Sequence, residues 1–169
     1  MASTYEKIAT NTLSSNASSV TFSSISGSYT DLVLVCNVIG VGANTDENCS
    51  IQVNGDTGSN YSMTRLRGNG TAASSDRDTS ATSAIAGIIT VKTTDDGTRS
   101  NVIVNFQNYS NATTYKTWLS RSSSALYNVQ AMANLWRSTS AITSIKFQIN
   151  SNNFGTGSTF TLYGILKAA

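Results

Sequence analysis

The chain contains no histidine among its 169 residues. Ser-His-Asp and Cys-His nucleophile pairs, a histidine general base and a histidine-ligated metal are therefore excluded. No glycine-rich phosphate-binding loop precedes a helical segment, so a nucleotide would lack its usual cradle. The sequence predicts that the protein is not an enzyme, holds no metal and uses no cofactor.

Charge is also scarce. Charged residues make up 12% of the chain, the formal net charge is +2, and no lysine or arginine stands next to another. Nucleic acids and anionic membranes are bound by clustered basic residues, so neither is an expected partner. No stretch approaches the ~20 apolar residues of a membrane span, and the first residues lack the pattern of a signal peptide. We expect synthesis in a cytoplasm.

Proline is absent as well, so every backbone N–H after the first residue can join a sheet, and no proline blocks an exposed edge. What is abundant is short and polar: 27 Ser, 23 Thr and 17 Asn supply 67 of the 169 residues. Threonine, valine, isoleucine and tyrosine favour strands, whereas serine, asparagine and glycine favour turns. This composition favours an all-β fold with partners on its edges.

Alternation of apolar and polar residues indicates eleven strands. The predicted strands are Tyr5–Leu13, Ser19–Ser23, Asp31–Ile39, Ser50–Asn54, Tyr61–Arg67, Ile85–Lys92, Val102–Asn108, Tyr115–Ser120, Tyr127–Leu135, Ile142–Asn150 and Ser158–Leu166. Hairpin turns are expected at Asn54-Gly55, Asn69-Gly70 and Asp96-Gly97, and a long polar surface loop at Thr71–Ser83. We predict one domain over residues 1–169, a two-sheet antiparallel β-sandwich of jelly-roll-like connectivity.

Two alternating sets are assigned to the core between the sheets, namely Leu32, Leu34, Cys36 and Val38, and Val102, Val104 and Phe106. Cys36 and Cys49 flank a turn-like segment and could form a disulfide across a hairpin. We favour the alternative, in which both are small core residues that stay thiols.

The acidic residues offer three local pairs, which are Asp46-Glu47, Asp76 with Asp78, and Asp95-Asp96. We expect them in turns and solvated loops; a calcium site and a glycosidase pair are the alternatives. The triplet Asp56-Thr57-Gly58 occurs in aspartic-protease active sites, but it stands alone here and is assigned to a hairpin loop.

Six aromatic residues are expected to be core or interface anchors rather than a sugar-stacking platform, namely Tyr61, Tyr109, Tyr115, Trp118, Tyr127 and Trp136.

Three segments, Val20–Val35, Ile51–Tyr61 and Ser158–Ile165, resemble small virion structural proteins of tailed bacteriophages, cyanophages in particular. The resemblance implies a β-sandwich module of the kind found as capsid-associated proteins and as parts of tail fibres. It therefore implies a structural protein of the virion, made in the host cytoplasm. Nothing between Thr71 and Ser140 takes part in the resemblance.

The leading hypothesis is a capsid decoration (cement) protein that stabilises the shell, with the major capsid protein as partner and a homotrimer as the expected oligomer. A tail fibre or a receptor- or glycan-binding module is the alternative, and a glycan-degrading enzyme is a third. Residues 1–19 are predicted to be an N-terminal arm that reaches a neighbour, or else the first strand. The proposed partner contacts are Tyr5, Ile8, Asp76, Arg77 and Asp78.

Overall fold

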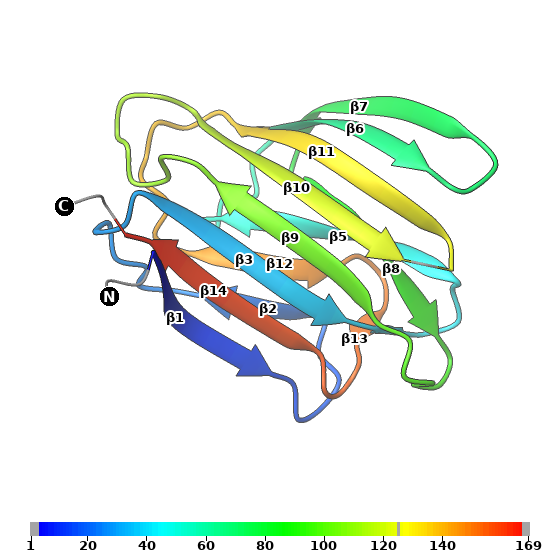
Figure 1. The fold of residues 1–169 in the computed structure, drawn as a ribbon. Coiled ribbons are helices and arrows are strands. Elements are labelled where there is room, and N and C mark those ends of the chain that lie inside the picture. The colour runs from blue at the N-terminus through cyan, green and yellow to red at the C-terminus, as the bar shows by residue number, and fades with distance from the viewer. Residues whose placement is uncertain (1–3, 125, 167–169) are drawn as a thin grey trace.

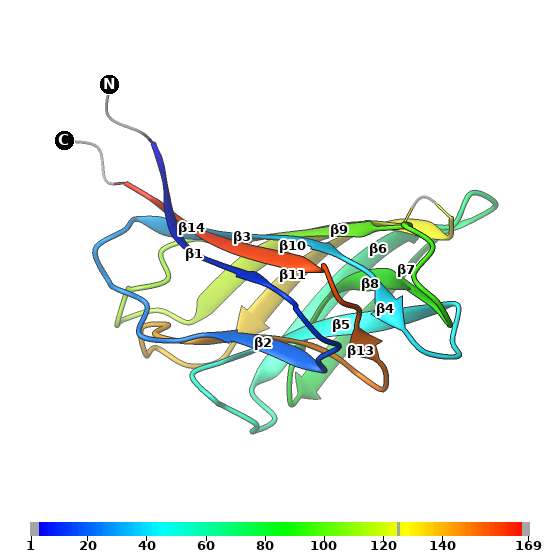
Figure 2. The same ribbon diagram turned by 90° about the horizontal axis from the view of Figure 1, so that it is seen from below.

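A computed structural model describes residues 4–124 and 126–166 and shows a two-sheet β-sandwich. Figures 1 and 2 show the two sheets as stacked layers, and the first described strand lies beside the last, with Tyr5 opposite Ile165. The predicted fold class is confirmed. Within the described residues there are fourteen strands, and no helix has the length and apolarity needed to cross a membrane.

The larger sheet has eight antiparallel strands. In spatial order they are β1 (Tyr5–Thr12), β14 (Thr159–Ile165), β3 (Asp31–Val38), β9 (Ser100–Phe106), β10 (Lys116–Ser124), β11 (Asn128–Trp136), β6 (Tyr61–Gly68) and β7 (Ala73–Ala81). The chain crosses repeatedly between the sheets, so strands far apart in sequence, such as β1 and β14, become neighbours. This connectivity is jelly-roll-like.

The smaller sheet has six strands and covers part of the larger one. In spatial order they are β13 (Asn153–Phe154), β4 (Gly40–Val41), β8 (Ala84–Lys92), β5 (Asp46–Val53), β12 (Ile145–Ile149) and β2 (Ser19–Phe22). β4 and β8 are parallel, and the other pairs are antiparallel. All eleven predicted strands are present; β4, β7 and β13 were not predicted.

The predicted core sets are confirmed. Leu32, Leu34, Cys36 and Val38 on β3 are fully buried, and so are their counterparts Val102, Val104 and Phe106 on β9. Cys36 and Cys49 are buried free thiols, as predicted, but they lie on different sheets and not across a hairpin. Burial raises the pKa of both thiols, so each stays protonated and unreactive.

The assignment of Thr71–Ser83 to a surface loop is wrong. Residues 73–81 form β7, which pairs with β6 from Gly68 opposite Ala73 to Tyr61 opposite Ala81. The turn that joins them contains Asn69-Gly70, the predicted hairpin signal, with Gly70 at a φ of 87°. β7 is exposed on both faces. It therefore has no hydrophobic alternation from which sequence could identify it.

The other two turn signals do not close hairpins. Asn54-Gly55 follows β5 and leads into β6, which belongs to the other sheet. Asp96-Gly97 likewise lies between β8 and β9 on different sheets. Both sequences supply the positive φ that a sharp turn needs, at Asn54 and Gly55 and at Gly97. A tight turn thus predicts a reversal but not that its two strands pair.

Candidate functional site

The outer face of β10, β11 and β6, which points away from the smaller sheet, is unusually apolar. β11 turns Val129, Ala131, Ala133 and Leu135 to this side, while Gln130, Met132 and Asn134 are buried on its inner side. Trp136 also faces inward, so the inner face of β11 mixes two amides with apolar side chains, while its outer face is aliphatic. The polarity is thus partly the reverse of that expected for a sheet with one face in water.

The exposed apolar residues of the three strands are neighbours. In register, Leu119 lies opposite Ala133 and Arg121 opposite Ala131, while Ala131 in turn lies opposite Leu66. Leu119, Leu66 and Val129 are 56%, 64% and 61% exposed, respectively. We call this surface the outer patch, comprising Leu66, Leu119, Val129, Ala131 and Ala133. Contiguous exposed apolar surface of this kind marks an interaction site.

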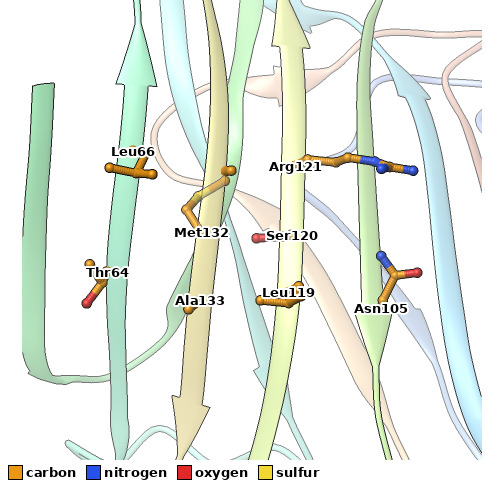
Figure 3. Close-up of a pocket in the computed structure, with 9 residues that line it drawn as sticks. Thr64, Leu66, Asn105, Leu119, Ser120, Arg121, Met132 and Ala133 are labelled. Carbon is orange, nitrogen blue, oxygen red and sulfur yellow. The ribbon is translucent and has the colours of Figure 1, made fainter. Parts of the chain in front are cut away.

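The outer patch is hollowed where alanines stand between leucines. A hollow of about 370 Å³ is lined by Thr64, Leu66, Asn105, Leu119, Ser120, Arg121, Ala131, Met132 and Ala133. Figure 3 shows these side chains on four adjacent strands. Hollows of about 360 and 490 Å³ adjoin it and share lining residues with it. A protruding side chain of a partner would have somewhere to insert.

The charge at this surface has one sign. Arg121 lines the central hollow, Arg77 and Arg67 line its neighbours, and none of the residues lining the three hollows is acidic. A partner surface that is neutral or weakly acidic would suit it.

The inner side of the same strands is partly polar because it supports the part of β8 that β4, which pairs only with Val91 and Lys92, leaves without a neighbouring strand. The N–H groups of Ile88 and Thr90 point away from β5, and they donate to the hydroxyl oxygens of Ser122 (3.2 Å) and Ser100 (2.9 Å) on the larger sheet. The approach is close: a Cβ on Gly87 would lie 2.4 Å from that of Ser122. Serine hydroxyls inside the sandwich thus accept the backbone hydrogen bonds of β8 that the carbonyl groups of a neighbouring strand would otherwise accept.

Two inward amides of β11 complete this polar interior. In the amide orientation that gives both its nitrogen and its oxygen a hydrogen-bond partner, Asn134 donates to Ile85 O (3.1 Å) and accepts from Trp118 Nε1 (3.3 Å). Gln130 donates to Asn128 Oδ1 at 2.9 Å, while its buried Oε1 has no hydrogen-bond partner in the described part of the chain. The interior between β8 and the strands β10 and β11 is therefore held by hydrogen bonds as well as by apolar contacts.

The predicted contacts Tyr5 and Ile8 lie on β1, at one edge of the larger sheet. β1 pairs with β14 of the same chain, Tyr5 opposite Ile165, so residues 5–12 form an integral strand and not a detached arm. The Tyr5 ring meets that of Tyr163 edge-on at 6.3 Å, and Ile8 packs against the core beside a register shift. Of the two alternatives for the N-terminal segment, the first strand is correct; Ala2 and Ser3 lie outside the described residues.

Asp76, Arg77 and Asp78 lie on β7, at the opposite edge of the larger sheet, so the structure does not bring the two groups of predicted contacts together. Asp76 accepts two hydrogen bonds from the Arg65 guanidinium, at 2.9 and 2.8 Å, and a third Arg65 bond goes to Asn48 Oδ1 at 3.3 Å. The first two bonds hold the pKa of Asp76 below its usual value. Arg77 lies opposite Thr64 beside the outer patch. Asp76 thus has a structural role, and Arg77 is the member of the group closest to the candidate site.

The Asp56-Thr57-Gly58 triplet also has a structural role. It lies in the connection from β5 to β6, where the Asp56 carboxylate accepts hydrogen bonds from Trp136 Nε1 (2.6 Å), Asn60 Nδ2 (2.9 Å) and Gly58 N (2.8 Å). The bond from Trp136 is the largest influence that lowers the pKa of this carboxyl. An aspartate held in this way secures a loop.

The remaining chemical candidates are dispersed. Asp95 and Asp96 lie in the turn before β9, as expected, but Asp46 and Glu47 belong to β5 and Asp76 and Asp78 to β7, which are strands and not loops. Within the described residues no three Asp, Glu or Cys side chains are grouped as a metal site would require. Tyr61, Tyr109, Trp118 and Trp136 are buried, so the six aromatics do not form an exposed platform.

No family model and no curated protein matches the sequence. Among solved structures, the fold is similar to the galectin LEC-6 of Caenorhabditis elegans, with 9% identity over 94% of this chain and 96% of that chain and a TM-score of 0.36. The alginate lyase Aly36B has 10% identity over 83% of this chain and 72% of that one, with a TM-score of 0.32. A legume lectin-like domain from Entamoeba histolytica has 9% identity over 95% and 81%, respectively, with a TM-score of 0.25. Likenesses this weak carry no argument about function.

Proposed function

We propose that this chain is a structural protein of a bacteriophage virion, a capsid decoration protein that docks through its outer patch and catalyses no reaction. The observation that supports docking is the partly reversed polarity of β11, which keeps two amides inside and exposes Val129, Ala131 and Ala133. The sequence resemblance described above supports the virion. Neither a cofactor nor a nucleic acid nor a membrane has a part in the proposal.

The partner we propose is another virion protein, the major capsid protein first, and not a second copy of the outer patch. Two patches stacked face to face would bring Arg121 and Arg77 of one copy near those of the other, with no carboxylate among the lining residues to separate them. Like charges brought together in a desolvated contact are unfavourable. A weakly acidic capsid surface with protruding side chains has the complementary character.

Docking would act mechanically. A protein that binds across neighbouring capsid subunits adds its binding free energy only to the assembled shell, so mass action favours that state over the opened one. The sparse charge of the outer patch suits this role, because burying few ions avoids a large desolvation penalty.

The same proposal includes the expected homotrimer, and β7 bears on its symmetry. In a two-fold dimer, the β7 strands of two copies would pair antiparallel, and the residue on the two-fold axis would lie opposite its own copy. With Asp76, Arg77 or Asp78 on the axis, two like charges would therefore stand opposite each other on the same face of the sheet. This disfavours a two-fold dimer through β7 and favours a head-to-tail ring. Light scattering of the purified protein should give the mass of three chains; a monomer at high concentration would contradict this part.

The docking proposal is tested by sedimentation of labelled protein with capsid shells and, separately, with tails, both purified without it. We expect wild-type protein to sediment with shells and the variant Leu119→Asp to remain in solution. Thr21→Asp is the matched control, because Thr21 is exposed on β2 of the other sheet and should leave binding unchanged. Wild-type protein that fails to bind shells, or that binds tails alone, overturns the capsid assignment.

A further inference from the structure

A second concave site lies on the other side of β6, where the end of the β6–β7 hairpin overhangs the smaller sheet. It is a cleft of about 450 Å³, lined by residues of both sheets and of two turns. Its polar lining comprises Asp46, Arg67, Asn69, Ser74, Tyr127 and Asn128. The volume falls within the range of small-molecule sites.

Much of the hydrogen-bonding capacity of this cleft is unused. The carboxylate of Asp46 has no hydrogen-bond or ion-pair partner among residues 4–124 and 126–166. Arg67 makes one bond, from Nε to Ser74 Oγ at 3.3 Å, which leaves its two terminal nitrogens available. An anionic acceptor and a cationic donor therefore line one cleft without neutralising each other.

Two amide groups are held with their donors available. The Oδ1 of Asn69 accepts from the backbone N–H groups of Thr71 (3.1 Å) and Ala72 (2.8 Å), and that of Asn128 accepts from Gln130 Nε2 (2.9 Å). Because the oxygen of each amide is engaged by its own loop or strand, its orientation is fixed before any ligand arrives. Pre-organised donors bind with a smaller entropic cost than mobile ones.

We propose that this cleft binds a neutral saccharide. A sugar hydroxyl both donates and accepts, so neighbouring hydroxyls can donate to Asp46 and accept from Arg67, Asn69 and Asn128. The Tyr127 ring, half-buried at the cleft, supplies an apolar surface for the C–H face of a sugar ring.

Charged ligands fit less well. A phosphate or a carboxylated sugar attracted by Arg67 would meet the Asp46 carboxylate, and a metal ion would find one carboxylate where calcium requires six to eight oxygen ligands. One positive and one negative side chain give the lining no net charge. A neutral, hydroxyl-rich molecule uses both groups without repulsion from either.

The cleft can be tested separately from the outer patch through residues that only the cleft contains. Arg67 and Ser74 line both the cleft and one hollow beside the outer patch, whereas Asp46, Asn69 and Asn128 line the cleft and none of the three hollows. Asp46→Asn should therefore leave the outer patch intact, Leu119→Asp should leave the cleft intact, and either proposal can fail alone.

The test is a glycan array that contains neutral, carboxylated and phosphorylated oligosaccharides, followed by calorimetry with the strongest neutral oligosaccharide. We expect wild-type binding to be selective for neutral members and Asp46→Asn to weaken it at least tenfold, as loss of a hydrogen bond to a charged group does. Asp78→Asn is the matched control, since Asp78 is an exposed carboxylate of β7 outside the cleft, and it should bind like wild type.

Absence of binding to neutral members, a preference for charged ones, or equal binding by Asp46→Asn overturns the proposal. Should Asp46→Asn fail to fold, NMR of the wild type decides: the side-chain amide signals of Asn69 and Asn128 should shift on titration with the neutral oligosaccharide, and unchanged signals overturn it. Sedimentation of Asp46→Asn with shells should match wild type, which separates this result from a failure of docking.

Discussion

β3 and β11 lie in the same sheet, yet they bury different sets of side chains. All buried residues of β3 are apolar, whereas β11 buries Gln130 and Asn134 beside Met132 and Trp136 and turns its alanines outward. The difference follows from what each strand covers. β3 is assigned to the apolar core, while β11 and β10 face β8, whose backbone edge needs hydrogen-bond partners.

The comparison shows that one sheet can be stabilised in two ways. In the β3 half, removal of apolar surface from water dominates, at about 25 cal/mol per Å². In the β11 half, hydrogen bonds to β8 replace part of that burial, and the aliphatic surface that would have filled the core lies outside. A surplus of exposed apolar surface in one half is what a docking partner would cover.

The largest expected effect is in the apolar half. Phe106 is 1% exposed, and its ring lies 5.2 Å from that of Trp118. Phe106→Ala should lower the free energy of unfolding by about 3–5 kcal/mol, because transfer and cavity costs add. Equilibrium unfolding in urea of the variant and the wild type measures this loss of free energy. A loss below about 1 kcal/mol, as at a surface position, would remove the distinction between the two halves.

A smaller effect is expected in the polar half. Ser122→Ala keeps the Cβ that packs against Gly87 but removes the acceptor of the Ile88 N–H. A buried donor left unsatisfied should lower the free energy of unfolding by about 1–3 kcal/mol. Hydrogen exchange of the Ile88 amide should accelerate in parallel. Ser123→Ala, the exposed neighbour, is the control and should change neither measurement; if both variants behave alike, β8 does not depend on these hydroxyls.

The same comparison explains what the sequence could predict. The alternation in β3 and β9 identified both strands and their buried faces, because apolar residues there do face inward. On β11 the alternation locates the strand equally well, but it cannot say which face is buried, since that depends on β8. β7 carries no alternation at all, because neither of its faces is buried, and its pairing with β6 alone makes it a strand.

The candidate sites were harder to predict for a related reason. The outer patch joins β6 to β10 and β11, and the cleft joins Asp46 to Arg67 and Asn128, so each depends on register between distant segments. Asp76, Arg77 and Asp78 were predicted as contacts because they stand in the long polar run Thr71–Ser83. Polarity marked an exposed segment correctly, but it could not reveal that Arg65 already binds Asp76.

The ion pair between Arg65 and Asp76 should give a pH-dependent effect that is smaller still. The bond from Arg65 lowers the pKa of Asp76 from 3.8, so its stabilisation is present above that pH and is lost as the pH falls through the lowered pKa. Since the Asp76 side chain is 41% exposed, Asp76→Asn should lower the free energy of unfolding by about 1 kcal/mol or less at neutral pH. Urea unfolding at a series of acidic pH values should show the difference between wild type and Asp76→Asn shrink as the pH falls through the lowered pKa of Asp76; a constant difference would mean that charge is not its cause.

The smallest effect on stability is expected where the apolar surface faces outward. Leu119 is 56% exposed, so Leu119→Thr, which keeps a residue suited to strands, should change the free energy of unfolding by less than about 0.5 kcal/mol. The same exchange at Leu34, which is fully buried on β3, should lower it several-fold more, because it leaves a hydroxyl in the apolar core. Parallel urea titrations compare the two. If Leu119→Thr destabilises the isolated protein as much as Leu34→Thr does, the outer patch belongs to the core of the fold. If Leu119→Thr leaves the free energy of unfolding unchanged but weakens sedimentation with shells, Leu119 contributes to the contact and not to the stability of the fold. The outward-facing aliphatic side chains of the neighbouring β11 lead us to expect this result.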